Sequence, residues 1–401
     1  MRSGEAVTSR PTLVVLSDIR FPSPRANGIQ VVKTAHALAA RGCTVRLVVR
    51  HSDPRSTEGI LAEFGLDPAP RLHIDRLNVG HVPNASFIPR LRYLTQALLR
   101  ARRSSHEGAF ILTRDLQLAD LLLRLGCDRL CYEAHAVEAV MYEERHRLYG
   151  LKDAPSPAKR RRIENRERRV WTGARGFIAT TQGILTSFER LFGPRPRTAV
   201  VPNGCDVPKD RSFTPPSDGH RVVYAGQLYP WKGVDVLVQA FARLNRGELV
   251  IVGGLKGEGD FDRIQNLARD LNLGDRIRFL GSLPQKDVAA ELARATVVTA
   301  PFLKSAMTSD HTSPIKAFEA MAAGRPLLIS DTEASREIVE DGRTGMVVPP
   351  GNVEAWAKAL ERVLSDRSLQ MALARAAFEK ASHYSWARRA ERIEEFLGAF
   401  A

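Results

Sequence analysis

Residues 308–331 of this 401-residue chain combine residue types that bind phosphate and sugar hydroxyl groups. Ser313 and Pro314 favour the start of a helix, as its N-cap and its first residue. The N–H groups of a first helical turn lack partners, and Lys316 adds a full positive charge beside them, so a diphosphate could bind there. One turn deeper, the Glu319 carboxylate could accept hydrogen bonds from two sugar hydroxyls. The same pattern is also typical of an ordinary helix with a solvated glutamate. This segment alone therefore does not distinguish a ligand site from an ordinary helix.

The expected helix is short because the sequence bounds it at both ends. Ile315 and Phe318 are three residues apart and therefore share one face. Gly324 favours the left-handed conformation that ends a helix. Residues 327–330, LLIS, are typical of a buried parallel strand. The segment is thus expected to form a loop, a helix and a strand.

The composition, 44% hydrophobic and 26% charged, is that of an ordinary soluble protein, and the length predicts roughly two or three domains. No apolar run approaches the roughly 18 to 20 residues that cross a bilayer, and the amino-terminal stretch MRSGEAVTSRP lacks the apolar core of a signal peptide. We therefore expect a cytoplasmic protein. Without C-x-x-C spacing or a histidine cluster, reduced thiols are expected rather than disulfides or a metal site, for Cys43, Cys127, Cys131 and Cys205.

The net charge of +14 points to nucleic acid, an anionic membrane or an acidic substrate. The basic runs at residues 90–103 and 159–169 contain almost no aromatic residues, which argues against a nucleic-acid surface. Within the first run, apolar residues recur at helical spacing among arginines, as in a helix that lies at a membrane surface. A surface helix whose apolar stripe faces its own core explains the pattern equally well. The stripe consists of Leu91, Leu94, Leu98 and Ala101.

The chain opens as a βαβ unit, with strands expected at residues 13–19 and 44–49 and a helix between them that ends before Gly42. In such units ligands bind beyond the carboxyl ends of the strands, so the loop with Asn27 and Gly28 is a candidate ligand-binding loop. It lacks the G-x-G-x-x-G pattern of a dinucleotide site. We expect Gly28 to let a ligand approach the backbone closely.

Two further strands, at residues 109–115 and 129–135, are expected to end in polar residues on the same ligand side. A single histidine in such a place is about as often structural as catalytic, and both interpretations of His135 stay open here. The polar residues at these strand ends are Arg114, Asp115, Glu133 and His135.

Beyond a polar, proline-rich stretch the alternation of strands and helices begins again. The first strand of this second half leads into GQLYPWKG, residues 226–233, where Lys232 would face a phosphate unless it is an ordinary surface lysine. Asp260 and Asp262 form the only Asp-x-Asp of the chain and are expected to cap a helix rather than bind a metal. We expect no metal site.

These patterns predict an α/β protein with two tandem, doubly wound, Rossmann-like parallel-sheet domains and a cleft between them. We place an acceptor-binding domain at residues 1–204, a linker at 205–219 and a nucleotide-sugar-binding domain at 220–382. A carboxyl-terminal helix, residues 383–401, is expected to pack back on the first domain.

The motifs YAGQLYPWKG, IVGG, RFLGSL, TSPIKAFEAMAAGRPLLISD and REIVEDGRTGMVVPP resemble, in this order, the nucleotide-binding half of retaining GT-B glycosyltransferases of family 4, the glycogen-synthase-like group. ANGIQV, TRD and YEAH are similar to the acceptor half, and YSWARRAERIEEFL is similar to the helix that crosses back. The resemblance covers nearly the whole chain and is most specific in the second half.

The resemblance implies roles for particular residues. The family's basic pair falls on Gln227 and Lys232, so Lys232 is expected to hold the donor diphosphate, whereas Gln227 replaces the usual arginine. The family's two glutamates, eight residues apart, fall on His311 and Glu319. Glu319 is expected to bind the ribose, whereas His311 replaces the residue that contacts the donor sugar. His135 matches the histidine near the reacting sugar.

The resemblance therefore gives His135, Lys232 and Glu319 as catalytic residues. Asn27, Arg114, Asp115 and Glu133 are expected on the acceptor side of the cleft. The donor site is expected to consist of Gly28, Gly226, Gln227, Lys232, His311, Thr312, Ser313, Pro314, Ile315, Lys316 and Glu319.

The implied reaction moves a sugar from a UDP- or GDP-sugar to a saccharide or lipid-linked acceptor, with retention and without a metal or other cofactor. Lys232, Lys316 and the helix start would stabilise the charge on the leaving phosphate. Cell-surface polysaccharide or glycolipid synthesis, with peripheral contact to the anionic inner face of the membrane, is the expected setting. The alternatives are a non-catalytic nucleotide-sugar-binding homologue, an epimerase of the same shape, and a basic nucleic-acid binder, although we expect no nucleic-acid partner.

Overall fold

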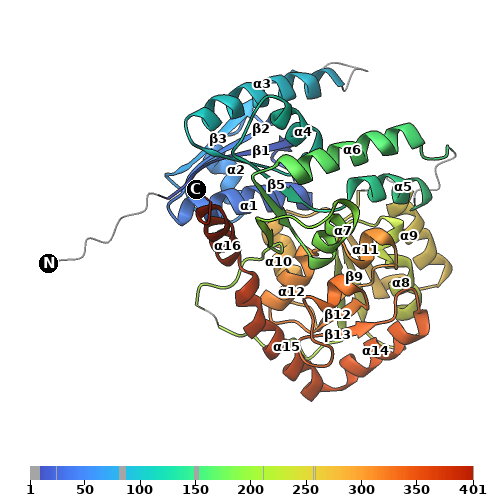
Figure 1. Ribbon diagram of the computed structural model, residues 1–401. Coiled ribbons are helices and arrows are strands. Elements are labelled where there is room, and N and C mark those ends of the chain that lie inside the picture. The colour runs from blue at the N-terminus through green and yellow to red at the C-terminus, as the bar shows by residue number, and fades with distance from the viewer. Residues whose placement is uncertain are drawn as a thin grey trace.

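The computed structural model describes residues 10–23, 25–80, 87–148, 153–210, 212–255, 257 and 259–400. Two parallel sheets form the centres of two α/β domains, as the alternation of strands and helices predicts (Figure 1). Nearly all of the amino-terminal stretch examined for a signal peptide lies outside the described residues. Among the helices that are described, none combines the length and the apolar composition needed to span a bilayer.

The first domain contains a seven-stranded parallel sheet in the order β3-β2-β1-β4-β5-β6-β7. Its strands are rich in buried apolar residues on both faces because helices cover both sides of the sheet. The strands are β1 Thr12–Phe21, β2 Thr44–His51, β3 Leu72–Leu77, β4 Phe110–Thr113, β5 Leu130–Ala134, β6 Gly176–Ala179 and β7 Thr198–Val200. The helices are α1 Ala26–Ala40, α2 Thr57–Glu63, α3 Phe87–His106, α4 Leu116–Arg124, α5 Glu138–Leu148, α6 Pro157–Gly173 and α7 Gln182–Phe192.

The second domain contains a six-stranded parallel sheet in the order β10-β9-β8-β11-β12-β13. Its strands are β8 Arg221–Ala225, β9 Glu248–Val252, β10 Ile277–Gly281, β11 Val297–Ala300, β12 Leu327–Ser330 and β13 Met346–Val348. The α-helices of this half are α8 Val234–Ala242, α9 Gly259–Asp270, α10 Gln285–Ala293, α11 Ala306–Ser309, α12 Ile315–Ala322, α13 Glu333–Arg336, α14 Val353–Ser365 and α15 Arg367–Ala381. Short 3-10 helices are η1 Pro230–Lys232, η2 Gly274–Arg276 and η3 Ser382–Tyr384.

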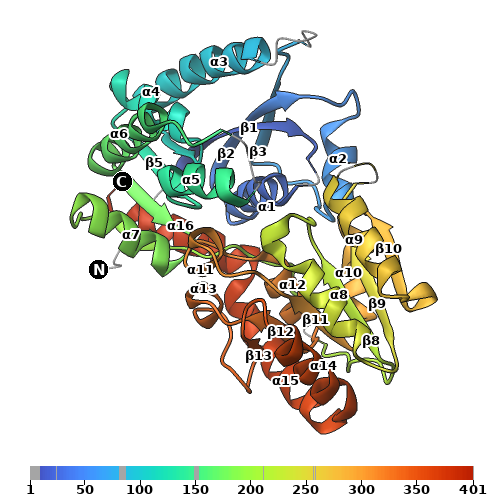
Figure 2. The same ribbon diagram turned by 90° about the vertical axis from the view of Figure 1, so that its right-hand side faces the viewer.

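The last helix, α16 Trp386–Gly398, leaves the second domain and packs against α1 of the first (Figures 1 and 2). Ser385 caps it by accepting a hydrogen bond from the Arg388 N–H group. Its apolar face completes the core of the first domain, where Trp386, Ile393 and Leu397 are buried. The end of the chain is therefore fixed to the domain in which it begins.

The two domains also contact each other directly beside the cleft. The Thr181 hydroxyl donates a hydrogen bond of 2.6 Å to the carbonyl of Asp310. The Glu337 carboxylate accepts hydrogen bonds from the backbone N–H groups of Gln182 and Gly183, at the start of α7. A carboxylate at a helix amino terminus is favourable because the exposed N–H groups carry partial positive charge. These contacts fix the two domains to each other.

The long basic helix α3 has two apolar stripes rather than one. Leu94 and Ala101 of the predicted stripe are buried against the first domain, together with Tyr93. Leu91, which the sequence places on the same stripe, is exposed to solvent together with Leu99. The interpretation of α3 as a surface helix that faces its own core is therefore correct for one stripe, while a second apolar stripe remains at the surface.

All four cysteines are buried and unpaired, in agreement with the prediction of reduced thiols. Burial raises the pKa of the Cys43 and Cys131 thiols, to about 11 and about 12. A buried thiol with a raised pKa is chemically inert near neutral pH. The cysteines therefore act as small core residues.

Candidate active site

A cavity of about 270 Å³ lies between the carboxyl ends of the two sheets. Both domains line it, because the segments that follow β4 and β5 face those that follow β8 and β11. From the first domain the predicted site residues at the cavity are Asn27, Arg114 and His135. From the second domain they are Gly226, Gln227, Lys232, Thr312, Ser313, Pro314, Ile315 and Lys316.

Charges of one sign face this cavity. The described lining residues include the cations Arg114, Lys232 and Lys316 but no aspartate or glutamate. Three cations around a partly enclosed space create a positive potential that favours an anionic ligand. The cavity is therefore suited to a phosphate-bearing molecule.

Lys232 is positioned by the turn that follows the first strand of the second domain. It ends the short helix η1, and the next residue, Gly233, has a positive φ of 64°. A Cβ atom at Gly233 would lie 1.8 Å from the carbonyl oxygen of Pro301, so only glycine permits this packing. The Lys232 ammonium lies 4.8 Å from the centre of the Phe302 ring. Burial lowers the pKa of Lys232 to about 8.

Helix α12, which the sequence predicts to bind phosphate at its start, begins one residue later than expected. Pro314 occupies its N-cap position with an extended backbone, and no side chain caps the helix. The prediction that Ser313 is the N-cap is wrong because its hydroxyl accepts a hydrogen bond from the backbone N–H of Asn203 in the other half of the chain. The stop at Gly324 is confirmed by its φ of 64°. The start of α12 thus lies at the cavity without a side-chain cap of its own.

Asn203 links the first domain to this helix start. Its side-chain amide donates a hydrogen bond of 2.8 Å to the carbonyl of Ser313. Its buried Oδ1 atom has no partner among the described residues, and the side chain lines the cavity. An unpaired buried acceptor is costly, so Oδ1 is suited to accept a hydrogen bond from a ligand.

Glu319 does not line the cavity but lies one turn behind it. Its carboxylate forms an ion pair of 2.6 Å with Lys316 and accepts a hydrogen bond from the side-chain amide of Gln285. Both of these partners do line the cavity. Glu319 therefore holds in place two side chains of the cavity wall.

His311 is also set back from the cavity. Its side chain is only 6% exposed, and Nδ1 has no partner among the described residues. Burial, together with the nearby Arg190, lowers its pKa to about 4. A neutral histidine therefore stands where the family resemblance places an ionised glutamate.

Two residues predicted to lie at the ligand have structural tasks instead. A Cβ atom at Gly28 would lie 2.6 Å from the Ser23 carbonyl oxygen, so the close approach that requires glycine is made by the chain itself and not by a ligand. The Asp115 carboxylate caps α4 by accepting a hydrogen bond from the Leu118 N–H group, and it pairs with Arg90 at 3.1 Å. Neither residue lines the cavity.

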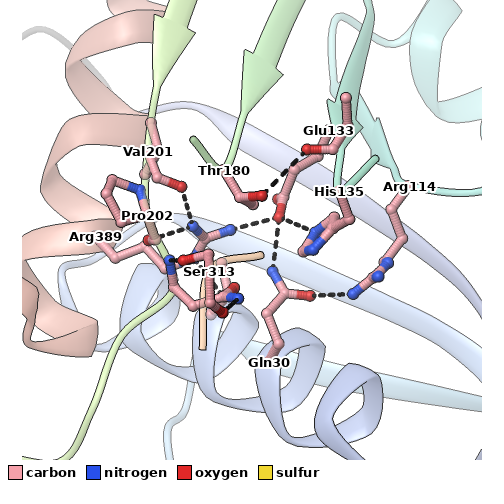
Figure 3. A network of polar contacts seen from close by, with 12 residues as sticks. Gln30, Arg114, Glu133, His135, Thr180, Val201, Pro202, Ser313 and Arg389 are labelled. Atoms are coloured by element: carbon pink, nitrogen blue, oxygen red, sulfur yellow. Dashed lines mark hydrogen bonds and ion pairs between the residues drawn. The ribbon is translucent and has the colours of Figure 1, made fainter. Parts of the chain in front are cut away.

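Glu133 lies behind His135 on the wall of the first domain. The His135 Nε2 atom is 2.6 Å from the Glu133 carboxylate, which also contacts Gln30 and Arg389 (Figure 3). Burial and the nearby Arg114 lower the pKa of His135 to about 4, so the imidazole is neutral at pH 7. Of this pair only His135 lines the cavity.

Several polar residues of the site escaped the sequence analysis. Asn203 follows the end of β7, so the same strand-end argument that identified Arg114 also applies to it. No comparable signal distinguishes Arg389, the buried arginine of α16, from the exposed arginines of the same helix. The missed residues are Gln30, Asn203, Gln285 and Arg389.

Comparisons with known proteins agree with this architecture. The family model "Glycosyl transferase 4-like domain" matches residues 28–204, and "Glycosyl transferases group 1" matches residues 208–380. A D-inositol 3-phosphate glycosyltransferase from Corynebacterium aurimucosum is 32% identical over 395 residues, which cover 91% of this chain and 89% of the relative.

Solved structures share the fold at lower identity. Sucrose-phosphate synthase from Thermosynechococcus elongatus aligns with a TM-score of 0.74 and 23% identity, covering 97% of this chain and 99% of the other. HepE from Anabaena, in complex with UDP-glucose, aligns with a TM-score of 0.73 and 19% identity, covering 97% and 100%. The two parallel-sheet domains and the cavity between them have the GT-B architecture. The chain belongs to the group 1 glycosyltransferases, with a first domain of the family 4 type.

The lowered pKa of Lys232 leads to a pH-dependence prediction for ligand binding. A diphosphate binds the charged lysine more tightly, and Lys232 of the free protein loses its charge as the pH rises through about 8. Above pH 7 the phosphates of UDP are already ionised. We expect the Kd for UDP, measured by calorimetry, to be constant between pH 7 and 7.5 and to rise by up to about tenfold per pH unit above 8.

The Lys232→Arg variant is the matched control because arginine stays charged throughout this range. Its affinity for UDP should be independent of pH between 7 and 9.5. The interpretation would be wrong if the parent protein showed no inflection, or if the inflection persisted in Lys232→Arg.

Proposed function

We propose that the protein transfers a sugar from a nucleoside-diphosphate sugar to a saccharide or lipid-linked acceptor, with retention of the anomeric configuration. The observation that carries this proposal is the inter-domain cavity, whose described lining contains Arg114, Lys232 and Lys316 but no carboxylate. The complex of HepE from Anabaena with UDP-glucose supports a uridine nucleotide as the first donor to examine, with guanosine nucleotides as the alternative.

Leaving-group stabilisation is the main catalytic contribution of the cavity. When the bond from the anomeric carbon to the phosphate oxygen breaks, the electron pair stays on the diphosphate. Lys232, Lys316 and the N–H groups at the start of α12 would hold this growing charge. Fixed donors and cations reduce such a barrier because they need no reorganisation during the reaction.

The proposed retention does not use a covalent intermediate on the protein. A double displacement requires a side chain, usually a carboxylate, that forms a covalent glycosyl intermediate. The described lining residues include no carboxylate, because Glu133 and Glu319 are both set back. Without such an intermediate, retention requires the acceptor hydroxyl to attack from the face that the diphosphate leaves. Its oxygen bonds to the anomeric carbon, and its proton passes to the departing phosphate oxygen.

The protein's own cations would replace a divalent metal in this step. Asp260 and Asp262, the only Asp-x-Asp of the sequence, lie in the first turn of α9 and do not line the cavity. In the described part of the chain, no group of three or more possible metal ligands is found. Because Lys232 and Lys316 supply positive charge at the cavity, we propose that transfer needs no divalent cation.

The acceptor would enter from the first domain, where Asn27, Arg114 and His135 form the cavity wall. Hydroxyl-rich acceptors suit these polar groups. The relative from Corynebacterium aurimucosum is a D-inositol 3-phosphate glycosyltransferase, which suggests a phosphorylated polyol as one acceptor to examine. An anionic or lipid-linked saccharide acceptor, as used in cell-surface polysaccharide or glycolipid synthesis, is consistent with the basic first domain.

The exposed stripe of α3 supports peripheral contact with an anionic membrane. Phe87, Leu91 and Leu99 are 68%, 59% and 67% exposed. Arg102 and Arg103 are exposed on the same helix. Apolar side chains flanked by arginines are typical of a helix that lies in the surface of an anionic bilayer. In both views α3 runs along the outer edge of the first domain, away from the second domain (Figures 1 and 2).

Replacing Lys232 tests the proposed reaction. We expect Lys232→Ala to lower the rate of nucleotide release from UDP- or GDP-sugars by about 10²- to 10³-fold, because one fixed charge at the leaving group is lost. Lys358→Ala is the control, since Lys358 is 76% exposed on α14 and far from the cavity lining. Activity should persist in EDTA, and NMR of the product should show the donor's anomeric configuration. Full activity of Lys232→Ala, or an inverted product, would contradict the proposal.

Vesicle binding tests the membrane contact. We expect the parent protein to sediment with vesicles of phosphatidylcholine and phosphatidylglycerol but not with phosphatidylcholine alone. The double variant Leu91→Ser, Leu99→Ser should weaken this binding by at least about tenfold, because it removes two apolar side chains from the interface. The control replaces two exposed leucines elsewhere, Leu191→Ser and Leu271→Ser. Equal binding by both double variants would disprove the role of α3.

A further inference from the structure

The carboxylate behind His135 collects three hydrogen-bond donors on one oxygen (Figure 3). Glu133 Oε1 accepts from Gln30 Nε2 at 2.8 Å and from Arg389 Nη2 at 2.6 Å, and it lies 2.6 Å from His135 Nε2. These donors come from α1, from α16 and from the segment after β5. Glu133 itself is only 4% exposed.

The charge of Glu133 determines which nitrogen of His135 carries hydrogen. Burial opposes ionisation of the carboxylate, but Arg389, His135 and Arg114 outweigh it and hold the pKa of Glu133 well below its usual range. An ionised carboxylate can only accept hydrogen bonds. At 2.6 Å the Nε2 atom of His135 must therefore be a donor.

The imidazole is neutral, so it has a single N–H group. Burial and Arg114 lower the pKa of His135 to about 4 although Glu133 and its hydrogen bond raise it. Since Nε2 carries the hydrogen, Nδ1 has a free lone pair. Nδ1 makes no hydrogen bond to the described residues, and His135 lines the cavity.

We propose that Glu133 is a positioning residue that fixes His135 as the Nε2–H tautomer, so that Nδ1 accepts a hydrogen bond from a hydroxyl group of the bound substrate. Arg389, on the carboxyl-terminal helix, is the second positioning residue because it holds Glu133 in place. The hydroxyl ligand rests on the proposed function, whereas the tautomer is a property of the free protein.

Arg389 is held firmly enough for this task. Its Nε donates to the Thr34 hydroxyl at 3.0 Å, and its Nη1 donates to the carbonyls of Val201 and Pro202, both at 2.7 Å. With Glu133 as its fourth partner, the guanidinium is only 2% exposed. A lysine could supply the charge but not this planar set of donors.

The orientation of the Gln30 amide agrees with an acceptor at Glu133. Arg114 donates to Gln30 Oε1 at 3.2 Å, and arginine can only donate. The other end of the Gln30 amide must then be the NH₂ group, which points to Glu133. Glu133 Oε1, the partner of His135 Nε2, is therefore an acceptor for every group around it. The Nε2–H tautomer of His135 is consistent with all of these contacts.

NMR of the full-length protein labelled with ¹⁵N-histidine tests the tautomer directly. At pH 7 the His135 resonances, assigned by their loss in His135→Asn, should show a protonated Nε2 and an unprotonated Nδ1. The Nε2–H form should exceed the other tautomer by at least about tenfold, the ratio that corresponds to about 1.4 kcal/mol. A charged ring, or a dominant Nδ1–H form, would overturn the proposal.

Variants separate positioning from mere structural support. Glu133→Leu removes the oxygen that accepts from His135, so both tautomers of His135 should become populated. Glu133→Gln should keep the Nε2–H form, because its amide oxygen must face the donors Gln30 and Arg389. Arg389→Met should shift the tautomer ratio in the same direction, and Arg389→Lys should shift it less. Arg388→Met is the matched control, because Arg388 is the exposed neighbour on α16 that pairs with Glu391. An unchanged tautomer ratio in folded Glu133→Leu would refute the role of Glu133, and an unchanged ratio in folded Arg389→Met would refute that of Arg389.

Turnover of a UDP- or GDP-sugar tests the hydroxyl ligand. Glu133→Leu should lower kcat by at least about tenfold, while the Kd for UDP stays within about twofold, because the nucleotide is expected on the opposite wall. A shifted tautomer with unchanged kcat would show that Nδ1 does not serve the substrate. If the parent protein itself turned over no nucleotide sugar, the proposed function would fail, and the tautomer measurement would still decide the positioning role of Glu133.

Discussion

The main constraint on this protein is that two parallel sheets must present their carboxyl ends to one shared cavity. Parallel strands covered by helices on both faces bury mainly apolar side chains, so most polar groups gather where strands end. Arg114 and His135 follow strands of the first sheet, while Gly226 and Gln227 follow a strand of the second. The domain contacts and the returning helix α16 keep these two sets of strand ends opposite each other.

The distribution of charge around the cavity follows a common pattern on both walls. Cations and amides face the cavity, and each nearby carboxylate is placed behind them. Glu319 lies behind Lys316 and Gln285, and Glu133 lies behind His135. A diphosphate would thus meet positive charge without facing a carboxylate, while the buried carboxylates orient the groups in front of them. This arrangement links the proposed donor binding to the proposed tautomer of His135.

Much of the fold could be predicted from the sequence, because strand and helix periods are local signals. The strand-end argument placed Arg114 at the cavity, and the family resemblance placed Lys232 there. Local reasoning failed where a distant residue takes part. Ser313 looks like an N-cap, but Asn203, which is 110 residues away, engages its hydroxyl. Arg389 has the sequence context of a surface residue and is buried only because α16 crosses to the first domain.

A crystal structure of the protein with bound UDP or GDP would show whether this cavity binds a nucleoside diphosphate through its own cations. We expect the diphosphate to lie between Lys232 and the start of α12, with phosphate oxygens within hydrogen-bond distance of the Lys232 Nζ atom and of the first backbone N–H groups of that helix. A diphosphate bound outside this cavity, or bound inside it without contact to Lys232, would disprove this mode of binding.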